Sequence, residues 1–230
     1  MISKEIILVW VQGIELVPDY IIKKWHKLNP EFTIKLFDND IIIKFLEDNY
    51  TEEFVNFYNK IKFYKYKSDF FRYCYLYING GYYIDIDTDP IIPMKNLELE
   101  KETFVSMLSL YFKGHIAQGI LFTNTKNPII KKCLSDMLYY GYNIGIDPPD
   151  KYPYFGHPTK CMYDNISKLT NKSILYDEMI ESNDEIILLG KEINFNGRET
   201  ILINNKIFGY SRYLNYVQNK GFIESYITFK

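Results

Sequence analysis

The chain has 230 residues, a net charge of −2 and a pI near 6.0. A hydrophobic content of 47% excludes a disordered protein, and the length suffices for one domain with a substantial core. No basic run stands out, so nucleic acid is not an expected partner. The three cysteines, Cys74, Cys133 and Cys161, are far apart, which predicts neither a disulfide framework nor a zinc site.

Apolar runs in this chain are short. The N-terminal run Ile6–Val11 has about six residues, too few for the core of a signal peptide and far too few to span a bilayer. We therefore expect no signal peptide and no transmembrane helix, and a soluble, cytoplasmic protein.

The first fifty residues predict alternating strands and helices. Ile6–Val11 is typical of a buried strand, and Pro18 suits the first turn of a helix that runs through Trp25. Phe32–Phe37 alternates apolar and polar residues as a strand does, and Asp38 can cap a second helix. This β-α-β-α order favours a parallel sheet covered by helices.

Two further helices are expected between residues 52 and 78, where Gly80-Gly81 ends the second, before a short strand over Tyr82–Ile86. We expect the residues from Asp147 to Pro158 to form a loop beside the site, and the chain end has little pattern. No repeat or linker divides the chain, so a single α/β domain over residues 1–230 is predicted. Its later elements are strands over Phe104–Leu110, Ile116–Phe122 and Ile186–Leu189, and helices over Pro128–Tyr140 and Thr159–Leu169.

An acidic cluster follows the Tyr82–Ile86 strand. Asp85, Asp87 and Asp89 alternate with other residues, and residues two apart share a face in extended chain, so at least two carboxylates converge. Converging carboxylates repel unless a cation lies between them, and oxygen ligands favour Mg²⁺ or Mn²⁺. The cluster also lies at the carboxyl end of a strand, where open α/β sheets bind ligands.

Several interpretations compete for this cluster, the simplest being a solvated acidic turn. An EF-hand is excluded, because its required glycine and glutamate are replaced by Pro90 and Asn96. A Mg²⁺-dependent phosphohydrolase of the haloacid-dehalogenase kind, with Asp85 as nucleophile, remains the alternative. Its signature has Thr or Val where this chain has Asp89, and it usually lies near the chain start. The remaining interpretation is a nucleotide-sugar site.

The twenty residues from Ser68 to Asp87 read S-D-x-x-R-x-x-x-L-x-x-x-G-G-x-Y-x-D-x-D. This segment resembles the signature of the D-x-D sugar transferases of glycosyltransferase family 32, and it is similar to the glucosyltransferase core of large clostridial toxins. The resemblance covers roughly residues 5 to 130. It implies a GT-A-like (Rossmann-like) fold with a mixed, mostly parallel sheet, a donor-binding half over about residues 1–125 and an acceptor-side half over about 126–230.

The same resemblance implies a nucleotide-sugar donor such as a UDP-sugar, a glycan or other hydroxyl acceptor, Mn²⁺ or Mg²⁺ as cofactor, and retention of anomeric configuration. Carried over by position, Asp87 is the expected metal ligand and Asp85 its partner, touching metal and ribose. Asp69 and Arg72, three apart on a helix and hence neighbours, are expected to contact the donor's sugar and diphosphate. With Arg72, the two metal-binding aspartates form the expected catalytic set, since a metal offsets the leaving group's charge. Trp10 is the expected stacking platform for the base.

Tyr83 of the motif and Gln118 complete the expected donor-binding residues. Gln118 stands near the place where many relatives have an Asn, and its amide is a candidate for a contact near the acceptor. No carboxylate is in a good position to serve as the base of an inverting reaction; Asp147 and Asp150 in the Pro-rich loop are the nearby reserves, and His157 is a further candidate.

The later half departs from the family pattern. His157 stands within Phe155–Pro158, where relatives carry Thr-Gly-Pro, and Ile207–Tyr213 lacks the His and Ser-Trp with which many relatives close the metal and phosphate site. The sequence therefore leaves open how the site closes, and a non-catalytic nucleotide-sugar-binding module remains a further alternative.

Overall fold

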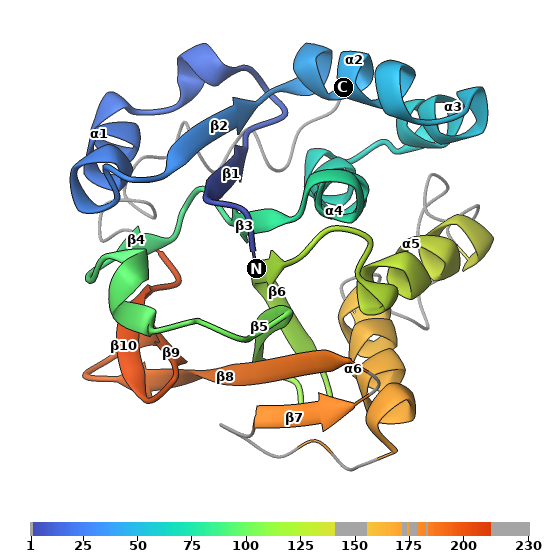
Figure 1. The fold of residues 1–230 in the computed structure, drawn as a ribbon. Coiled ribbons are helices and arrows are strands. Elements are labelled where there is room, and N and C mark those ends of the chain that lie inside the picture. Colours follow the sequence, from blue (N-terminus) through green and yellow to red (C-terminus); the bar gives the residue numbers. More distant parts are fainter. Residues whose placement is uncertain (1, 141–155, 172–173, 175–178, 183, 213–230) are drawn as a thin grey trace.

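The computed structural model describes residues 2–140, 156–171, 174, 179–182 and 184–212 (Figure 1). Its first elements are β1 (Glu5–Val9), η1 (Ile14–Leu16), α1 (Asp19–Leu28), β2 (Thr33–Phe37), α2 (Asn39–Asn49), α3 (Glu52–Lys60), α4 (Tyr64–Asn79), β3 (Gly81–Ile84), β4 (Asp89–Pro90) and η2 (Met94–Leu97). The rest are β5 (Phe104–Leu108), β6 (Ile116–Thr123), α5 (Pro128–Tyr140), α6 (Gly156–Thr170), β7 (Met179–Ser182), β8 (Glu185–Phe195), β9 (Arg198–Ile203) and β10 (Lys206–Tyr210).

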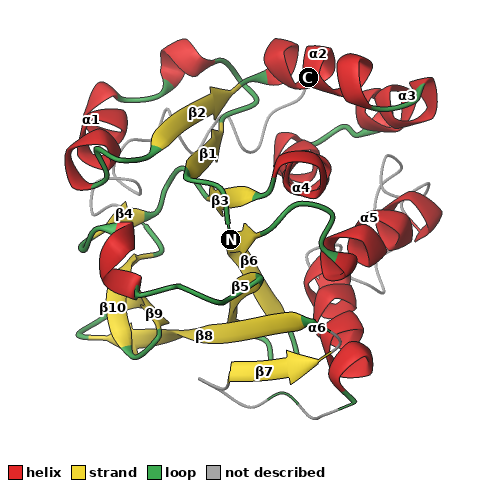
Figure 2. Ribbon diagram, viewed as in Figure 1, coloured by secondary structure: helices red, strands yellow, loops and turns green. Residues whose placement is uncertain are grey.

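The strands form one mixed sheet in the order β2-β1-β3-β6-β5-β8-β9-β10-β4, with β7 paired to β8. The mixed α/β fold expected from the sequence is confirmed, with helices flanking a curled sheet (Figure 2). The expectation that parallel pairs dominate needs correction, because the parallel pairs are β1–β2, β1–β3 and β5–β8 and the other described pairs are antiparallel.

Tight turns explain the antiparallel half of the sheet. Asn196-Gly197 joins β8 to β9 and Asn204-Asn205 joins β9 to β10, and all four residues have positive φ. Two-residue turns with positive φ match the twist of antiparallel hairpins. The first three strands are instead joined through helices, which is how parallel neighbours are connected.

Strand alternation divides the core between the two faces of the sheet. Ile7 and Val9 of β1 pack into the cluster covered by α2 to α6, whereas Ile6 and Leu8 pack into the cluster covered by α1, η2 and the β9–β10 hairpin. In Figure 1, α4, α5 and α6 lie along the same side of the sheet. The carboxyl ends of β1 and β3 therefore open between two well-packed layers.

The corner between α4 and β3 requires glycine. Gly80 ends α4 with φ 64°, and a Cβ there would lie 2.7 Å from the carbonyl oxygen of Thr123. Gly81 follows with φ 109°. Residues with a side chain disfavour a positive φ and cannot place a Cβ so close to a carbonyl oxygen. The two glycines therefore allow α4 to turn at once into the strand that leads to Asp85.

The cysteines of the chain are free thiols, with Cys74 and Cys133 buried. Among the described helices, none has the length and apolar character needed to cross a bilayer. The expected loop from Asp147 to Pro158 falls largely outside the described residues, which resume at Gly156 with α6.

The N-terminus of α2 supplies a test of local sequence control. The Asp38 side chain accepts a hydrogen bond from the backbone N–H of Ile41 at 3.0 Å, as the sequence predicted for a cap. Asp38→Ala should lower the free energy of unfolding by about 1 kcal/mol, measured in urea, because one backbone donor loses its partner. Asp40→Ala is the matched control, since it removes an exposed carboxylate from the same turn without removing the cap. Equal losses for both variants would contradict the capping role.

Candidate functional site

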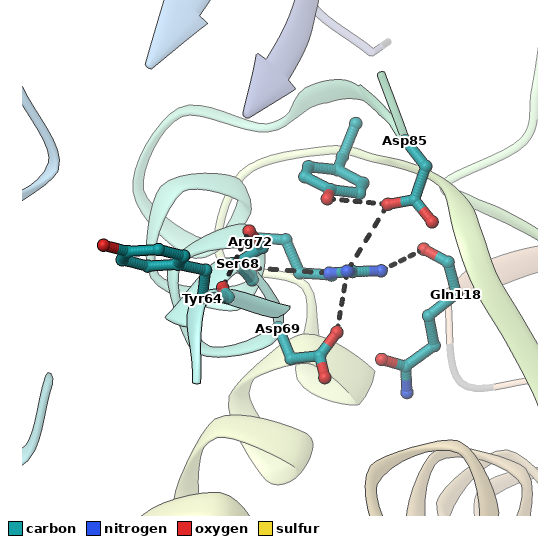
Figure 3. Close-up of polar contacts among 7 residues, drawn as sticks. Tyr64, Ser68, Asp69, Arg72, Asp85 and Gln118 are labelled. Atoms are coloured by element: carbon teal, nitrogen blue, oxygen red, sulfur yellow. Dashed lines mark hydrogen bonds and ion pairs between the residues drawn. The ribbon is translucent and has the colours of Figure 1, made fainter. Parts of the chain in front are cut away.

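A buried guanidinium lies at the centre of the candidate site. Arg72 Nη2 binds Asp69 Oδ1 at 2.7 Å and Asp85 Oδ1 at 3.4 Å, Nη1 donates to the carbonyl of Gln118, and Nε donates to the carbonyl of Ser68 at 3.4 Å (Figure 3). A planar fork of donors suits such a set of acceptors in several directions. Arg72 thereby joins α4, β6 and the end of β3.

Tyr83 completes the set of groups around this guanidinium. We call this set, formed by Asp69, Arg72, Tyr83 and Asp85, the Arg72 cage. The ring of Tyr83 lies 4.3 Å from the Arg72 Cζ atom, and its hydroxyl donates to Asp85 Oδ1 at 2.8 Å. Burial raises the pKa of this hydroxyl well above its ordinary value. Tyr83 therefore stays a neutral donor and orients one oxygen of Asp85.

Asp69 is held as the second carboxylate of the cage. Burial raises its pKa to about 6, and the charge of Asp85 adds to this, while Arg72 opposes it. The cage therefore keeps two carboxylates near one buried cation, with Asp69 largely buried and Asp85 partly exposed.

Asp85 leaves its other oxygen toward the open side of the sheet. Its Oδ2 faces Gly119 of β6, where a Cβ would lie 3.0 Å away, and its backbone N–H donates to the Gly119 carbonyl at 2.8 Å. Asp87 follows after a turn in which Thr88 N–H donates to the Asp85 carbonyl. Burial and then the Asp85 carboxylate raise the pKa of Asp87 to about 8, so the two carboxylates are close enough to repel each other.

These two carboxylates fit a Mg²⁺- or Mn²⁺-type cation. Among the described residues no group of three or more His, Cys, Asp or Glu side chains could hold a metal ion. Mg²⁺ is usually bound through one or two carboxylates while water and substrate phosphates fill its other positions. Two carboxylates with one outward-facing oxygen on Asp85 therefore suit a metal shared with a phosphate-bearing ligand better than a closed structural site.

Asp89 belongs to a different interaction. Its carboxylate binds Lys24 of α1 and lies 3.6 Å from Arg198 Nη2. Its two neighbouring cations neutralise it, so it does not join Asp85 and Asp87. Of the three alternating aspartates, the first two converge.

Two expected donor contacts lie in the core. Trp10 follows β1 at the same sheet edge as Asp85, as two parallel strands require, but only 5% of its surface is exposed and it packs on the opposite face from Tyr83. Gln118 is equally buried, and its backbone carbonyl rather than its amide contacts Arg72. His157 and Asp150 are not placed by the described side chains.

The structure adds residues from the second half that the sequence did not suggest. Glu199 lies close enough to Asp87 to raise its pKa, and Glu192 accepts hydrogen bonds from Ser211 Oγ at 3.0 Å and from the Leu110 N–H. Tyr111, exposed on the β5–β6 loop, donates to Glu199. The register of β8 and β9 brings Glu192 and Glu199 here, and no motif in those two strands revealed it.

Comparison with known proteins agrees with this geometry. Residues 18–104, which include the whole of α4, β3 and the Asp85–Asp87 pair, match the family described as "Glycosyltransferase sugar-binding region containing DXD motif". This segment is therefore similar to the sugar-binding region of the DXD glycosyltransferases. An uncharacterized glycosyltransferase of Acanthamoeba polyphaga mimivirus is 36% identical over 134 residues, which cover 56% of this chain and 49% of the relative.

Two further comparisons extend the relationship. HOC1 of Saccharomyces cerevisiae, provisionally named a glycosyltransferase, is 33% identical over 87 residues, covering 37% of this chain and 22% of its own. Among solved structures, the PaToxG glycosyltransferase matches with a TM-score of 0.52 and 16% identity, over 73% of this chain and 69% of that one. This structural likeness supports the GT-A-type fold. The chain spans about half the length, or less, of the curated relatives it matches.

The Arg72 cage leads to a stability prediction. Arg72→Met should lower the free energy of unfolding by about 3 kcal/mol, because the largely buried Asp69 loses the cation that compensates its charge. Urea unfolding at pH 7 without added metal measures it. Arg72→Lys is the matched variant: it keeps the charge without the fork and should lose less. A loss below about 1 kcal/mol for Arg72→Met would show that the cage does not stabilise the fold.

Proposed function

We propose that this protein transfers a sugar from a nucleotide-sugar donor to a hydroxyl acceptor, with a divalent cation held by Asp85 and Asp87. The observation that carries the proposal is the placement of these two carboxylates at the carboxyl end of β3, with Asp85 fixed from behind by Arg72 and Tyr83. The DXD family match over residues 18–104 and the GT-A-type fold support the same reaction class.

The proposed donor is a nucleoside-diphosphate sugar such as a UDP-sugar, with Mn²⁺ or Mg²⁺ as cofactor. A cation at Asp85 and Asp87 would offset the negative charge that develops on the diphosphate as the glycosidic bond breaks. In this proposal Asp85 also contacts the ribose, Asp69 and Arg72 set the sugar end of the site, and Tyr83 holds Asp85 in orientation. The first half of the chain, about residues 1–125, would bind the donor and the second half the acceptor, with Gln118 between them.

Trp10 is proposed as the stacking partner of the base. Its position after β1 supports this, because β1 and β3 are parallel neighbours and end at the same edge as Asp85. Its burial means that stacking would use the rim of the ring or require a small rearrangement of the residues around it.

Removing the Asp87 carboxylate tests the metal assignment. Asp87→Ala should abolish Mn²⁺-dependent binding of nucleoside diphosphates and nucleotide sugars while the fold survives, because the cation loses the carboxylate proposed as its direct ligand. Without metal, the variant should be as stable as the wild type or slightly more so, since a repulsion between like charges is removed. Thermal shift with a panel of nucleotide sugars, with and without Mn²⁺, measures binding, and slow donor hydrolysis measures turnover.

Asp19→Ala is the control, because it removes one carboxylate at an exposed position of α1. Mn²⁺-dependent affinity that persists in Asp87→Ala would refute the assignment. Binding without hydrolysis or transfer would instead indicate a non-catalytic module, and release of phosphate from simple phosphomonoesters would indicate the phosphohydrolase.

The stereochemical outcome is the finer part of the proposal. The resemblance to family 32 implies retention, in which the leaving diphosphate assists deprotonation of the acceptor on the same face. We expect an α linkage in the first product formed from a UDP-α-sugar, as measured by proton NMR. A β linkage would require a base on the opposite face. Glu199, near Asp87, would then be the first residue to replace.

A further inference from the structure

The end of β10 returns to the acidic cluster. Antiparallel pairing places Gly209 opposite Pro90 and Tyr210 opposite Asp89. Arg212 follows two residues after Tyr210 and Asp87 lies two residues before Asp89, so the end of β10 comes near the turn that carries Asp87. The close approach depends on Gly209, because a Cβ at this position would lie 2.6 Å from the Asp89 carbonyl oxygen.

The backbone at Ser211 and Arg212 is held on both sides. Ser211 N–H donates to the Glu199 carbonyl at 3.0 Å, and its hydroxyl donates to Glu192. Arg198 donates to the carbonyl of Arg212 at 3.2 Å, and its own guanidinium lies over the Tyr210 ring. These contacts fix where the Arg212 side chain leaves the sheet.

The charge of Arg212 is not neutralised by an ion pair within the described part of the chain. The other cations around the cluster are paired: Arg72 with Asp69 and Asp85, and Lys24 and Arg198 with Asp89. Arg212 is exposed and forms no ion pair with any described carboxylate. Burial and Asp85 raise the pKa of Asp87, and the hydrogen bond to Glu199 raises the pKa of the Tyr111 hydroxyl; the charge of Arg212 opposes both shifts, so its guanidinium lies within electrostatic range of both groups.

An anion would complete this arrangement. A divalent cation neutralises Asp85 and Asp87, and a nucleoside diphosphate bound to that cation brings further negative charge. A guanidinium presents a fork of donors that matches two phosphate oxygens, and it stays charged at every pH at which the protein is folded. The nearby Glu192 and Glu199 would repel a phosphate that lacked such a counter-charge.

We propose that Arg212 binds the diphosphate of the nucleotide from the side opposite the Asp85–Asp87 pair, and so closes the donor site where relatives use other residues. The inference rests on the proposed function, because it takes a nucleoside diphosphate as the ligand. Arg212 contacts the leaving group in this scheme, with its backbone positioned by Arg198 and Ser211.

The test measures how two Arg212 variants bind ligands with and without phosphates. Arg212→Gln and Arg212→Lys are titrated with the best-bound member of a panel of nucleoside diphosphates in Mn²⁺, and with the matching nucleoside that lacks phosphates. Arg212→Gln should weaken diphosphate binding by about ten-fold or more and leave nucleoside binding unchanged, since it removes charge-assisted hydrogen bonds. Arg212→Lys should recover part of the loss, because it restores the charge but not the fork.

Lys206→Gln is the control for long-range electrostatics. Lys206 opens β10, roughly 20 Å of strand from Arg212, which exceeds the Debye length of about 8 Å at physiological salt. It should bind diphosphate as the wild type does. Unchanged diphosphate affinity in Arg212→Gln, or equal losses for diphosphate and nucleoside, would overturn the role of Arg212 alone. A wild type that binds no nucleoside diphosphate would refute the proposed function and this inference with it.

Discussion

The site depends on one constraint: two carboxylates must meet a single buried guanidinium at the point where a helix turns into a strand. Asp69 and Arg72 come from one face of α4, and Asp85 from the end of β3. Gly80 and Gly81 make the turn between these elements abrupt enough for the three groups to meet. A buried charge network is costly unless every member is compensated, so a change in one member disturbs the placement of the others.

Asp85 and Asp89, two of the three alternating aspartates, make different contacts. One oxygen of Asp85 is fixed by Tyr83 and Arg72, while the other faces outward across Gly119. Asp89 is anchored to Lys24 and Arg198 and fastens the following turn to α1 and the β9–β10 hairpin. The three aspartates therefore differ in their surroundings: Asp85 is held by the cage, Asp87 is proposed to share a metal with it, and Asp89 attaches the loop.

The sequence predicted the first 140 residues well because local rules decide them. The cap at Asp38, the glycines after α4 and the periodicity of each segment act over a few residues, and the motif from Ser68 to Asp87 is contiguous. The β9–β10 hairpin escaped prediction although Asn196-Gly197 is a recognisable turn signal, because its strands are short and polar at their outer ends. Glu199 could not be assigned to the site, since only pairing between distant strands brings it there. The segment Ile207–Tyr213 matches the place where relatives carry the residues that close the site, but without their His and Trp it gave no role to Arg212. For Trp10, the sequence predicted the position at the end of the strand but not the burial of the side chain.

The pairing of β4 with β10 has a consequence for how the protein matures. More than half of the chain separates Asp89 from its partner Tyr210. During synthesis the Arg72 cage can form as soon as β6 has left the ribosome, because its members lie between Ser68 and Gln118. The strand that returns to the acidic cluster arrives last, and contacts of such high sequence separation are the slowest to form. A nascent chain would therefore carry a finished Arg72 cage, with its acidic turn still unpaired, until β10, the last strand among the described residues, docks against β4.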